Sequence, residues 1–380
     1  MAISVDFKDL INKDKDAYDI IDIRSSDDFD FGHIPGAINI PETVLENFSK
    51  LNKNKEYYIC CKSGVKSEDV ADTLCENGFK AFSLNAGYIG YLRSQIKEVK
   101  NGTIASNAEL SLQKKFRKEI LSKFLKAIKT YDLIQPNDKI AVCISGGKDS
   151  FLMAKLFQEL LRFTEIPFEV VFLCMDPGYS KENRELIEVN AKNLNIPLTF
   201  FETDIFDSVV NVDKSPCYLC ARMRRGHLYS AAEKLGCNKI ALGHHFDDVI
   251  ETILMGMLYG GQIQTMMPKL HSDNFGNMQL IRPLYLIREK DIKHWRDYNN
   301  LHFLQCACRF TATCSIDGGN DQTASKRKKV KHIIANIAKD DPCIEQNIFK
   351  SIENVNLATV IAYKDKHGTH HSFLDDYDEK

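Results

Sequence analysis

Three groups of residues in this chain of 380 residues have the types and spacing to do chemistry on sulfur or phosphate. The first begins at Cys61, which opens the run Cys-Lys-Ser-Gly-Val-Lys-Ser between an expected strand at 56–60 and a helical pattern at 67–77. A loop in this place directs backbone N–H groups toward its own centre, at the positive end of the helix dipole, and Lys66 can add a cation. Such a cradle stabilises a thiolate or a persulfide anion, so the run predicts an exposed, nucleophilic thiol that carries one sulfur atom.

Further motifs around Cys61 make residues 1–98 similar to the rhodanese-like domains along nearly their whole length. The motifs are Asp22-Ile23-Arg24, the run FGHIPGAINIP at 31–41, the Cys61 loop and Leu84-Asn85-Ala86-Gly87. The resemblance implies an α/β domain in which Cys61, not Cys60, receives persulfide sulfur. Family members usually have arginine where this chain has Lys66, and Cys60 at the strand end is expected to be a buried structural cysteine.

The second group is a turn between an expected strand at 139–144 and an expected helix at 148–162. It consists of Ser145, Gly146, Gly147, Lys148, Asp149 and Ser150. Two glycines let the backbone approach a phosphate, while N–H groups, hydroxyls and the lysine bind it. The run lacks the Gly-x-x-x-x-Gly-Lys spacing of a P-loop. It resembles the signature of the PP-loop pyrophosphatases, which implies conversion of ATP to AMP and pyrophosphate with adenylation of a carbonyl oxygen. The alternative is a plain helix cap with a glycine turn.

The third group is drawn from the 12 cysteines. Its members are Cys217, Cys220, Cys306, Cys308 and Cys314. The Cys-x-x-Cys spacing at 217–220 fits a redox pair or half of a metal site. Zinc would use two pairs of thiolates, although the second pair has only one intervening residue. Three thiolates with an open fourth iron suit an iron–sulfur cluster that binds exogenous sulfur. Buried pairs without metal are the third alternative, and the cysteines at 75, 143, 174, 237 and 343 are expected to be packing residues.

Residues 112–362 resemble the tRNA 2-thiocytidine synthetase family. The matching pieces are 145–150, PCYLC at 216–220 with 222–225, ALGHHFDD at 241–248, YGG at 259–261, PKL at 268–270, IRPL at 281–284 and REK at 288–290. The resemblance implies ATP, Mg²⁺ and a 4Fe–4S cluster as cofactors. It places the cluster on Cys217, Cys220 and Cys306, with Cys308 as the alternative third ligand. Gly243 and Asp248 stand where the expected strand at 239–242 gives way to a helix, so Gly243 is expected to line the nucleotide pocket and Asp248 to lie near Mg²⁺ or the substrate base. A solvated helix start is the alternative.

From about residue 111, strands alternate with helices, which predicts a parallel sheet with helices on both faces. The expected fold is α/β. It comprises a rhodanese-like α/β domain (1–98), a linker (99–110), a PP-loop, Rossmann-like domain of the adenine nucleotide alpha hydrolase type with a C-terminal helical segment (111–364), and a flexible tail (365–380). No apolar run approaches the ~20 residues of a membrane span and the N-terminus does not resemble a signal peptide, so we expect a cytoplasmic protein without membrane contact.

Together these features predict an ATP-dependent sulfurtransferase that forms 2-thiocytidine in the anticodon loop of tRNA, with sulfur relayed as a persulfide on Cys61. The expected partners are tRNA and a persulfide donor such as a cysteine desulfurase, and a homodimer is left open. The net charge of −2 confines RNA contacts to local patches, for which basic runs at 114–118, 222–225 and 326–332 are candidates. Two alternatives stay open: thiolation of another base, as in 2-thiouridine synthetases, and sulfur trafficking by an ATP-binding protein that leaves RNA unmodified.

Overall fold

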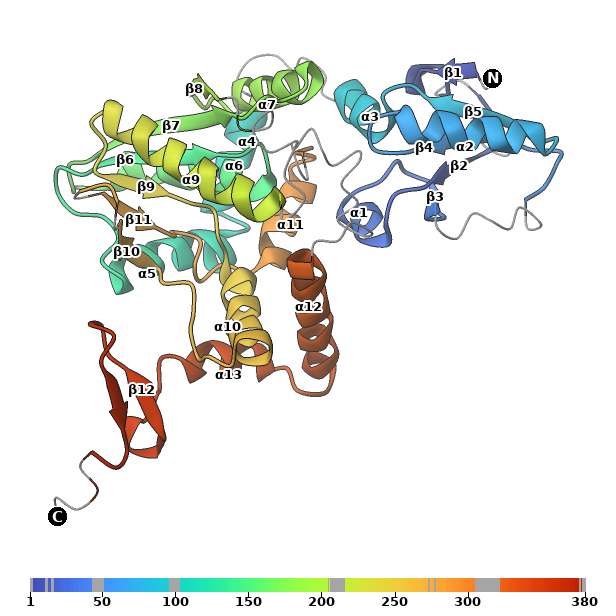
Figure 1. Cartoon of the computed structure of the whole chain (residues 1–380). Coiled ribbons are helices and arrows are strands. Elements are labelled where there is room, and N and C mark those ends of the chain that lie inside the picture. Colours follow the sequence, from blue (N-terminus) through green and yellow to red (C-terminus); the bar gives the residue numbers. More distant parts are fainter. Residues whose placement is uncertain are drawn as a thin grey trace. The chain divides into compact units, whose positions relative to one another are not determined.

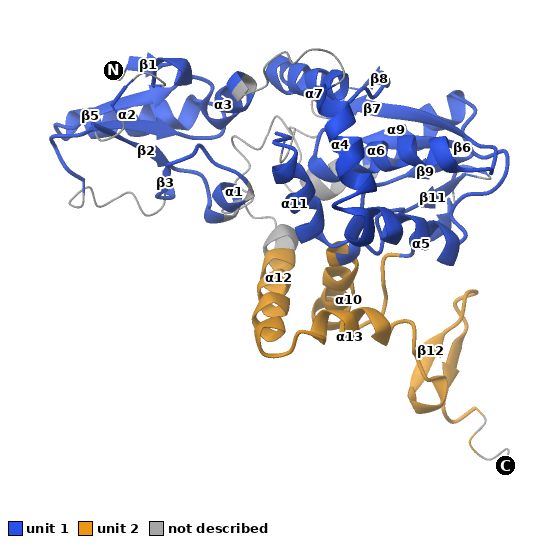
Figure 2. Ribbon diagram, turned by 180° about the vertical axis from the view of Figure 1, so that it is seen from behind, with its two compact units in different colours: residues 1–246, 267–322 blue, residues 247–266, 323–380 orange. Residues whose placement is uncertain are grey.

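The computed structural model describes residues 3–10, 13–14, 17–42, 51–95, 103–203, 205, 216–272, 274–276, 278–304, 322–375 and 377. The chain divides into two compact units, residues 1–246 with 267–322 and residues 247–266 with 323–380 (Figure 2). Among the described residues, no helix has the length and apolar character needed to cross a membrane.

The N-terminal part of the chain forms a five-stranded parallel sheet in the order β1-β5-β4-β2-β3 (Figure 1). Its strands are β1 (Ile3–Val5), β2 (Tyr18–Asp22), β3 (Ile38–Asn39), β4 (Glu56–Cys60) and β5 (Lys80–Leu84). Its helices are η1 (Phe7–Leu10), α1 (Ser26–Phe31), α2 (Val65–Glu76) and α3 (Gly87–Gln95). The strands predicted at 18–23 and 56–60 and the helix predicted at 67–77 are confirmed, with small differences at their ends.

The alternation of side chains along β4 gives this sheet two apolar faces. Cys60 packs in the cluster that includes Leu92 of α3, whereas the next residue, Cys61, packs in the cluster that includes Leu74 of α2. Successive residues of an extended chain point to opposite faces of the sheet. The two adjacent thiols are therefore separated by the sheet.

The second sheet has six strands in the order β10-β11-β9-β6-β7-β8. These are β6 (Lys139–Ile144), β7 (Glu169–Asp176), β8 (Leu198–Glu202), β9 (Lys239–Ala241), β10 (Lys269–His271) and β11 (Gln279–Ile281). All neighbouring pairs are parallel except β10 with β11, which is antiparallel. The predicted parallel sheet is confirmed, with an antiparallel strand added at one edge.

Helices cover both faces of the second sheet, as predicted. They are α4 (Thr103–Gln113), the π-helix η4 (Arg117–Leu121), α5 (Ser122–Thr130), α6 (Lys148–Phe163), α7 (Lys181–Asn193), α9 (Pro216–Lys234) and α11 (Glu289–Tyr298). On β6, Val142 packs in one cluster with Phe157 of α6, and Cys143 packs in another with Tyr229 of α9. The short apolar strand is thus buried from both sides.

The segment expected to be a linker, 99–110, is helical from Thr103 onward. On α4, Glu109 pairs with Lys155 of α6 at 2.5 Å and with Arg162 of the same helix at 2.7 Å. Lys155 is fully buried, and a buried ammonium group is costly unless it is paired. The polar residues that suggested a linker include Glu109, whose carboxylate pairs with the buried Lys155. Through this pairing α4 packs with α6 beside the second sheet.

The second unit contains α10 (Phe246–Gly260) and α12 (Gln322–Asp340), each without its first residue, together with α13 (Ile344–Ser351) and η6 (Leu357–Thr359). In place of the flexible tail expected at 365–380, residues 362–372 form a hairpin of β12 (Ala362–Lys364) and β13 (His370–Ser372). The carboxylate of Asp365 accepts hydrogen bonds from the backbone N–H groups of His367 and Thr369, at 2.8 and 2.9 Å, and so closes the turn.

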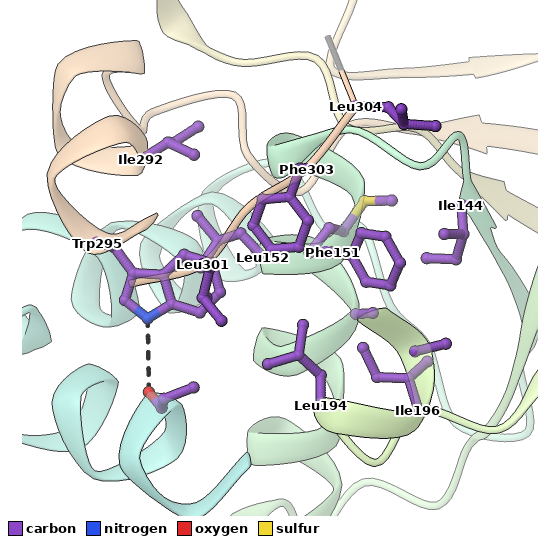
Figure 3. Close-up of a cluster of buried hydrophobic side chains, with 14 of the residues drawn as sticks. Ile144, Phe151, Leu152, Leu194, Ile196, Ile292, Trp295, Leu301, Phe303 and Leu304 are labelled. Atoms are coloured by element: carbon purple, nitrogen blue, oxygen red, sulfur yellow. Dashed lines mark hydrogen bonds between the residues drawn. The ribbon is translucent and has the colours of Figure 1, made fainter. Parts of the chain in front are cut away.

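A buried cluster packs α11 against the start of α6 (Figure 3). Phe151 and Leu152 of α6 lie in the same cluster as Ile292 and Trp295 of α11. The fully buried indole of Trp295 donates a hydrogen bond of 3.5 Å to the carbonyl oxygen of Ala108 in α4. Because such interiors are close-packed, the cluster fixes where the first turns of α6 and α11 lie.

Candidate functional site

The sulfur atom of Cys61 accepts a hydrogen bond from the loop backbone and contacts a serine hydroxyl at the start of α2. The backbone N–H of Gly64 donates to Cys61 Sγ at 3.1 Å, and Ser67 Oγ lies 3.3 Å from the same sulfur. Ser67 in turn donates to the carbonyl oxygen of Gly64 at 2.9 Å, which ties the first turn of α2 to the loop. One backbone N–H of the predicted cradle thus contacts the sulfur at the N-terminus of α2.

Cys61 is less accessible than the sequence analysis expected. The residue is only 4 % exposed, so the expectation of an exposed thiol is wrong for this structure. The cause is the close approach of the segment at 86–88: Tyr88 donates its N–H to Cys61 O at 2.8 Å, and a side chain at Gly87 would meet that oxygen at 2.3 Å.

Cys60 has the properties of a structural cysteine. It is fully buried, and this burial raises the pKa of its thiol well above the ordinary value. The ion pair below it, Arg24 with Asp22 at 2.6 Å, is also buried, and the guanidinium group lies 3.9 Å from the centre of the Tyr88 ring. The Asp-Ile-Arg motif thus supports the segment that closes over the Cys61 loop.

Lys66 lies at the surface and pairs with Glu42 at 3.0 Å. Both side chains are about half exposed, at 49 % and 47 %. A solvent-exposed pair of this kind contributes roughly 0–1 kcal/mol to stability. The contribution of Lys66 to sulfur chemistry stays a prediction.

The second candidate loop connects β6 to α6 at the carboxyl end of the parallel strands, where open α/β sheets bind their ligands. Ser150 Oγ donates to Gly147 O at 2.9 Å and accepts the N–H of Ser145 at 3.2 Å. Gly146 adopts φ = +88°, and an added Cβ would lie 2.8 Å from the side chain of Ile187. The glycine thus permits a backbone conformation and a close packing that other residues would strain.

Lys148 and Asp149 stand at the first turn of α6. The Lys148 ammonium lies 3.1 Å from Asp149 Oδ2 and 3.2 Å from Glu289 Oε1 at the start of α11. Its side chain is only 6 % exposed. His245 Nε2 lies 4.0 Å from the other carboxylate oxygen of Asp149. The sequence does not predict this contact of Glu289, because its neighbours along the chain give no sign that it meets the loop.

Gly243 follows β9, the strand beside β6, and lies against the same loop. A Cβ added to Gly243 would lie 3.3 Å from the carbonyl carbon of Asp149 and 3.3 Å from the nitrogen of Ser150. Leu304 also lies near this turn, since its carbonyl oxygen would be 3.5 Å from a Cβ added to Gly147. Three chain segments therefore converge on the turn.

Asp248 lies in the first turn of α10, within the second unit. Its carboxylate is 3.9 Å from the guanidinium group of Arg327 on α12, which also lies 3.3 Å from Glu251. One member of the basic run at 326–332 thus pairs with acidic residues of α10. A catalytic role for Asp248 stays a prediction.

The side chains of the proposed metal ligands lie outside the described parts of the structure. Cys217 and Cys220 belong to the first turn of α9, for which the backbone alone is described, and Cys306, Cys308 and Cys314 lie outside the described residues. In the parts of the chain that are described with side chains, no group of three potential ligands is close enough to hold a metal. The assignment of Cys306 as the third ligand, with Cys308 as the alternative, stays a prediction.

The cysteines expected to serve in packing divide into two sets. Burial raises the pKa of the Cys143 and Cys174 thiols to about 12, and Cys237 is also buried, so these three agree with the expectation. Cys75 and Cys343 are exposed, and the expectation is wrong for them. Both lie near helix ends, where the apolar spacing of neighbouring residues is a poor guide to burial.

Comparison with known proteins gives matches for both parts of the chain. Residues 5–94 match the rhodanese-like domain, and residues 113–308 match the PP-loop domain. A tRNA-cytidine(32) 2-sulfurtransferase from Citrifermentans bemidjiense is 33% identical over 235 residues, which cover 61% of this chain and 88% of the relative. The protein of the same name from Vibrio parahaemolyticus is 35% identical over 266 residues, or 68% of this chain and 82% of that protein. Among solved structures, the U34-tRNA thiolase NcsA from Methanococcus maripaludis aligns with a TM-score of 0.47 and 22% identity over 61% of this chain and 76% of that one.

Proposed function

The chain belongs to the PP-loop family that contains the tRNA-cytidine(32) 2-sulfurtransferases, and from this premise we propose that it is an ATP-dependent tRNA thiolation enzyme with a built-in sulfur carrier. The observation that carries the proposal is the presence, in one chain, of a phosphate-binding turn with Lys148 and a donor-lined loop around Cys61. The first activates an oxygen for replacement, and the second supplies sulfur. Formation of 2-thiocytidine combines the two.

The turn at 145–150 binds the phosphates of ATP. Its position at a helix N-terminus favours an anion, and Lys148 adds a positive charge that is buried and fixed. The carbonyl oxygen at C2 of cytosine attacks the α-phosphorus, and pyrophosphate leaves. A sulfur nucleophile then adds to C2, and AMP departs with the original oxygen. Each leaving group carries away the negative charge that develops, so donors fixed near the phosphates lower both barriers.

The cysteines that we propose as cluster ligands are Cys217, Cys220 and Cys306, with Cys308 as the alternative to the last. Their chemistry fits, because iron–sulfur clusters are held by thiolates. The spacing in sequence also fits, because Cys217 and Cys220 form a Cys-x-x-Cys pair, which is half of a metal site. A 4Fe–4S cluster on three thiolates supplies one iron with a free position for exogenous sulfur.

Sulfur enters the chain at Cys61. A thiolate there takes the outer sulfur of a donor persulfide, and the donor thiolate leaves. The backbone N–H of Gly64, which donates to Cys61 Sγ, and the positive end of the α2 dipole stabilise the resulting anion. Release as sulfide requires two electrons, which a thiol reductant supplies. Attachment of donor and acceptor in one chain raises the effective concentration of sulfur, to the millimolar range for a short flexible linker.

The nucleosides of tRNA from a deletion strain, analysed by mass spectrometry, test the proposed reaction. We expect 2-thiocytidine to disappear and to return when the intact gene is supplied. Loss of 2-thiouridine in its place would assign the enzyme to another base, and an unchanged set of thionucleosides would favour sulfur trafficking without RNA modification.

Replacement of Cys217 tests the cluster. Wild-type protein reconstituted anaerobically is expected to bind about four iron atoms per chain, whereas Cys217→Ala should retain little iron or acid-labile sulfide. Cys237→Ala is the matched control, because this buried cysteine of the same sheet region serves in packing. Stoichiometric zinc without iron in the wild type would establish the zinc alternative.

A further inference from the structure

The ammonium group of Lys148 is paired with two carboxylates that reach it from different parts of the chain. Asp149 is its neighbour in sequence and lies 3.1 Å away, whereas Glu289 comes from the first turn of α11 and lies 3.2 Å away. Glu289 is itself 3.4 Å from Lys293, one helical turn further along α11. The side chains of Lys148 and Glu289 are 6 % and 15 % exposed, so water screens their attraction only weakly.

The position of Glu289 is fixed by the packing of its helix. Ile292 and Trp295, on the next turns of α11, are fully buried in the cluster that holds Phe151 and Leu152 of α6 (Figure 3). The packing of the two helices therefore brings Glu289 to the first turn of α6. Glu289 also stands at a helix N-terminus, where the dipole favours its charged form.

From this geometry we propose that Glu289 is a specificity-determining residue of the nucleotide site: its carboxylate is an internal anion that pairs with Lys148 and that the phosphates of ATP must displace. The inference rests on the proposed function, because it assigns ATP to the turn at 145–150. A buried lysine without a partner would destabilise the chain, and Glu289 and Asp149 together supply that pairing in the site without nucleotide. Displacing it selects for ligands with several negative charges, since a weaker anion competes poorly with a carboxylate already in place.

The direction in which nucleotide affinity changes when Glu289 loses its charge distinguishes a competing carboxylate from one that positions Lys148. Removing the charge of Glu289 removes a competitor of phosphate, so nucleotide affinity should rise. If Glu289 instead held the lysine in the geometry that phosphate needs, the same change would lower the affinity. Asp149 remains as a partner in either case, so the lysine is not left unpaired and the protein should fold.

The test is a calorimetric titration of the full-length chain, wild type and Glu289→Gln, with ATP and separately with adenosine. Glutamine keeps the size of the side chain and removes its charge. We expect the dissociation constant for ATP to fall about tenfold, the scale of one charged hydrogen bond, and that for adenosine to change less than twofold. Asp291→Asn is the matched control: it removes a carboxylate of the same helix that pairs with Lys123 at 3.3 Å, and ATP affinity should stay within twofold of wild type.

Unchanged or weaker ATP binding by Glu289→Gln would overturn the proposal, as would an equal gain for adenosine, which has no phosphate to compete. The same gain in Asp291→Asn would also overturn it, because the effect would then belong to the net charge of α11. A wild-type chain that does not bind ATP would refute the proposed function together with this inference, whereas ATP binding that Glu289→Gln leaves unaltered refutes the inference alone.

Discussion

The loops at Cys61 and at Lys148 share one construction and differ in what they hold. Each follows a buried strand, and each has a serine in the first turn of the next helix whose hydroxyl donates to a glycine carbonyl at 2.9 Å, Ser67 to Gly64 and Ser150 to Gly147. In the first loop the bound group is the sulfur of its own Cys61. In the second, the charged groups are side chains arranged around a place for a diffusible anion.

The lysines of the two loops show the same difference. Lys66 is 49 % exposed and pairs at the surface, whereas Lys148 is 6 % exposed and pairs within the site. A covalently attached sulfur stays in its loop without a strong counter-charge. A nucleotide that must be bound, cleaved and released needs a charge that water does not screen. The two loops therefore share a backbone arrangement and differ in where their cation lies.

The largest effect is expected for replacement of Cys61, and it should depend on the source of sulfur. Cys61→Ser should abolish tRNA thiolation driven by a cysteine desulfurase persulfide, because the hydroxyl cannot carry sulfur, and leave thiolation driven by inorganic sulfide near the wild-type rate. Both sources are compared in one anaerobic assay of 2-thiocytidine. Equal loss with both would assign Cys61 a structural or docking role, and no loss with either would make the rhodanese-like domain dispensable for this reaction.

Lys148→Ala should lower thiolation about 10²- to 10³-fold with either sulfur source, since it removes a fixed donor from the phosphates. The measurement is the initial rate at saturating ATP and tRNA. Loss of thermal stability would complicate the result, so Lys148→Met, which keeps much of the apolar stem, serves as a second variant. A rate above half that of wild type in both would contradict the assignment of this lysine.

The smallest effect is expected at the exposed lysine. Lys66→Ala should slow persulfide-driven transfer less than about tenfold and change the free energy of unfolding by less than ~1 kcal/mol, because its pair with Glu42 is open to solvent. Lys66→Arg should restore the rate, and added salt should narrow the gap between variant and wild type. A loss as large as that of Cys61→Ser would instead place the ammonium group in the transfer step.

The chemistry of both loops could be predicted from sequence because each lies within a few consecutive residues. Glu289 could not, since it reaches Lys148 through the tertiary packing of Trp295 and Phe151, which no local pattern encodes. The helix α4 was mistaken for a linker for a related reason. Its polar Glu109 is required by a lysine 46 residues away, and composition alone cannot distinguish a solvated carboxylate from a paired one.

The separation of Cys60 from Cys61 by the sheet has a consequence for the lifetime of bound sulfur. Neighbouring thiols that point to opposite faces cannot meet the geometry of a disulfide, so Cys60 cannot attack a persulfide on Cys61. Cys75 is also too far away to attack such a persulfide. It lies ten residues after Val65, the first residue of α2, and ten residues of helix span about 15 Å. Among the described residues of this domain, no second thiol is placed to attack sulfur on Cys61, so we expect sulfur loaded there to leave only to an acceptor from outside the domain.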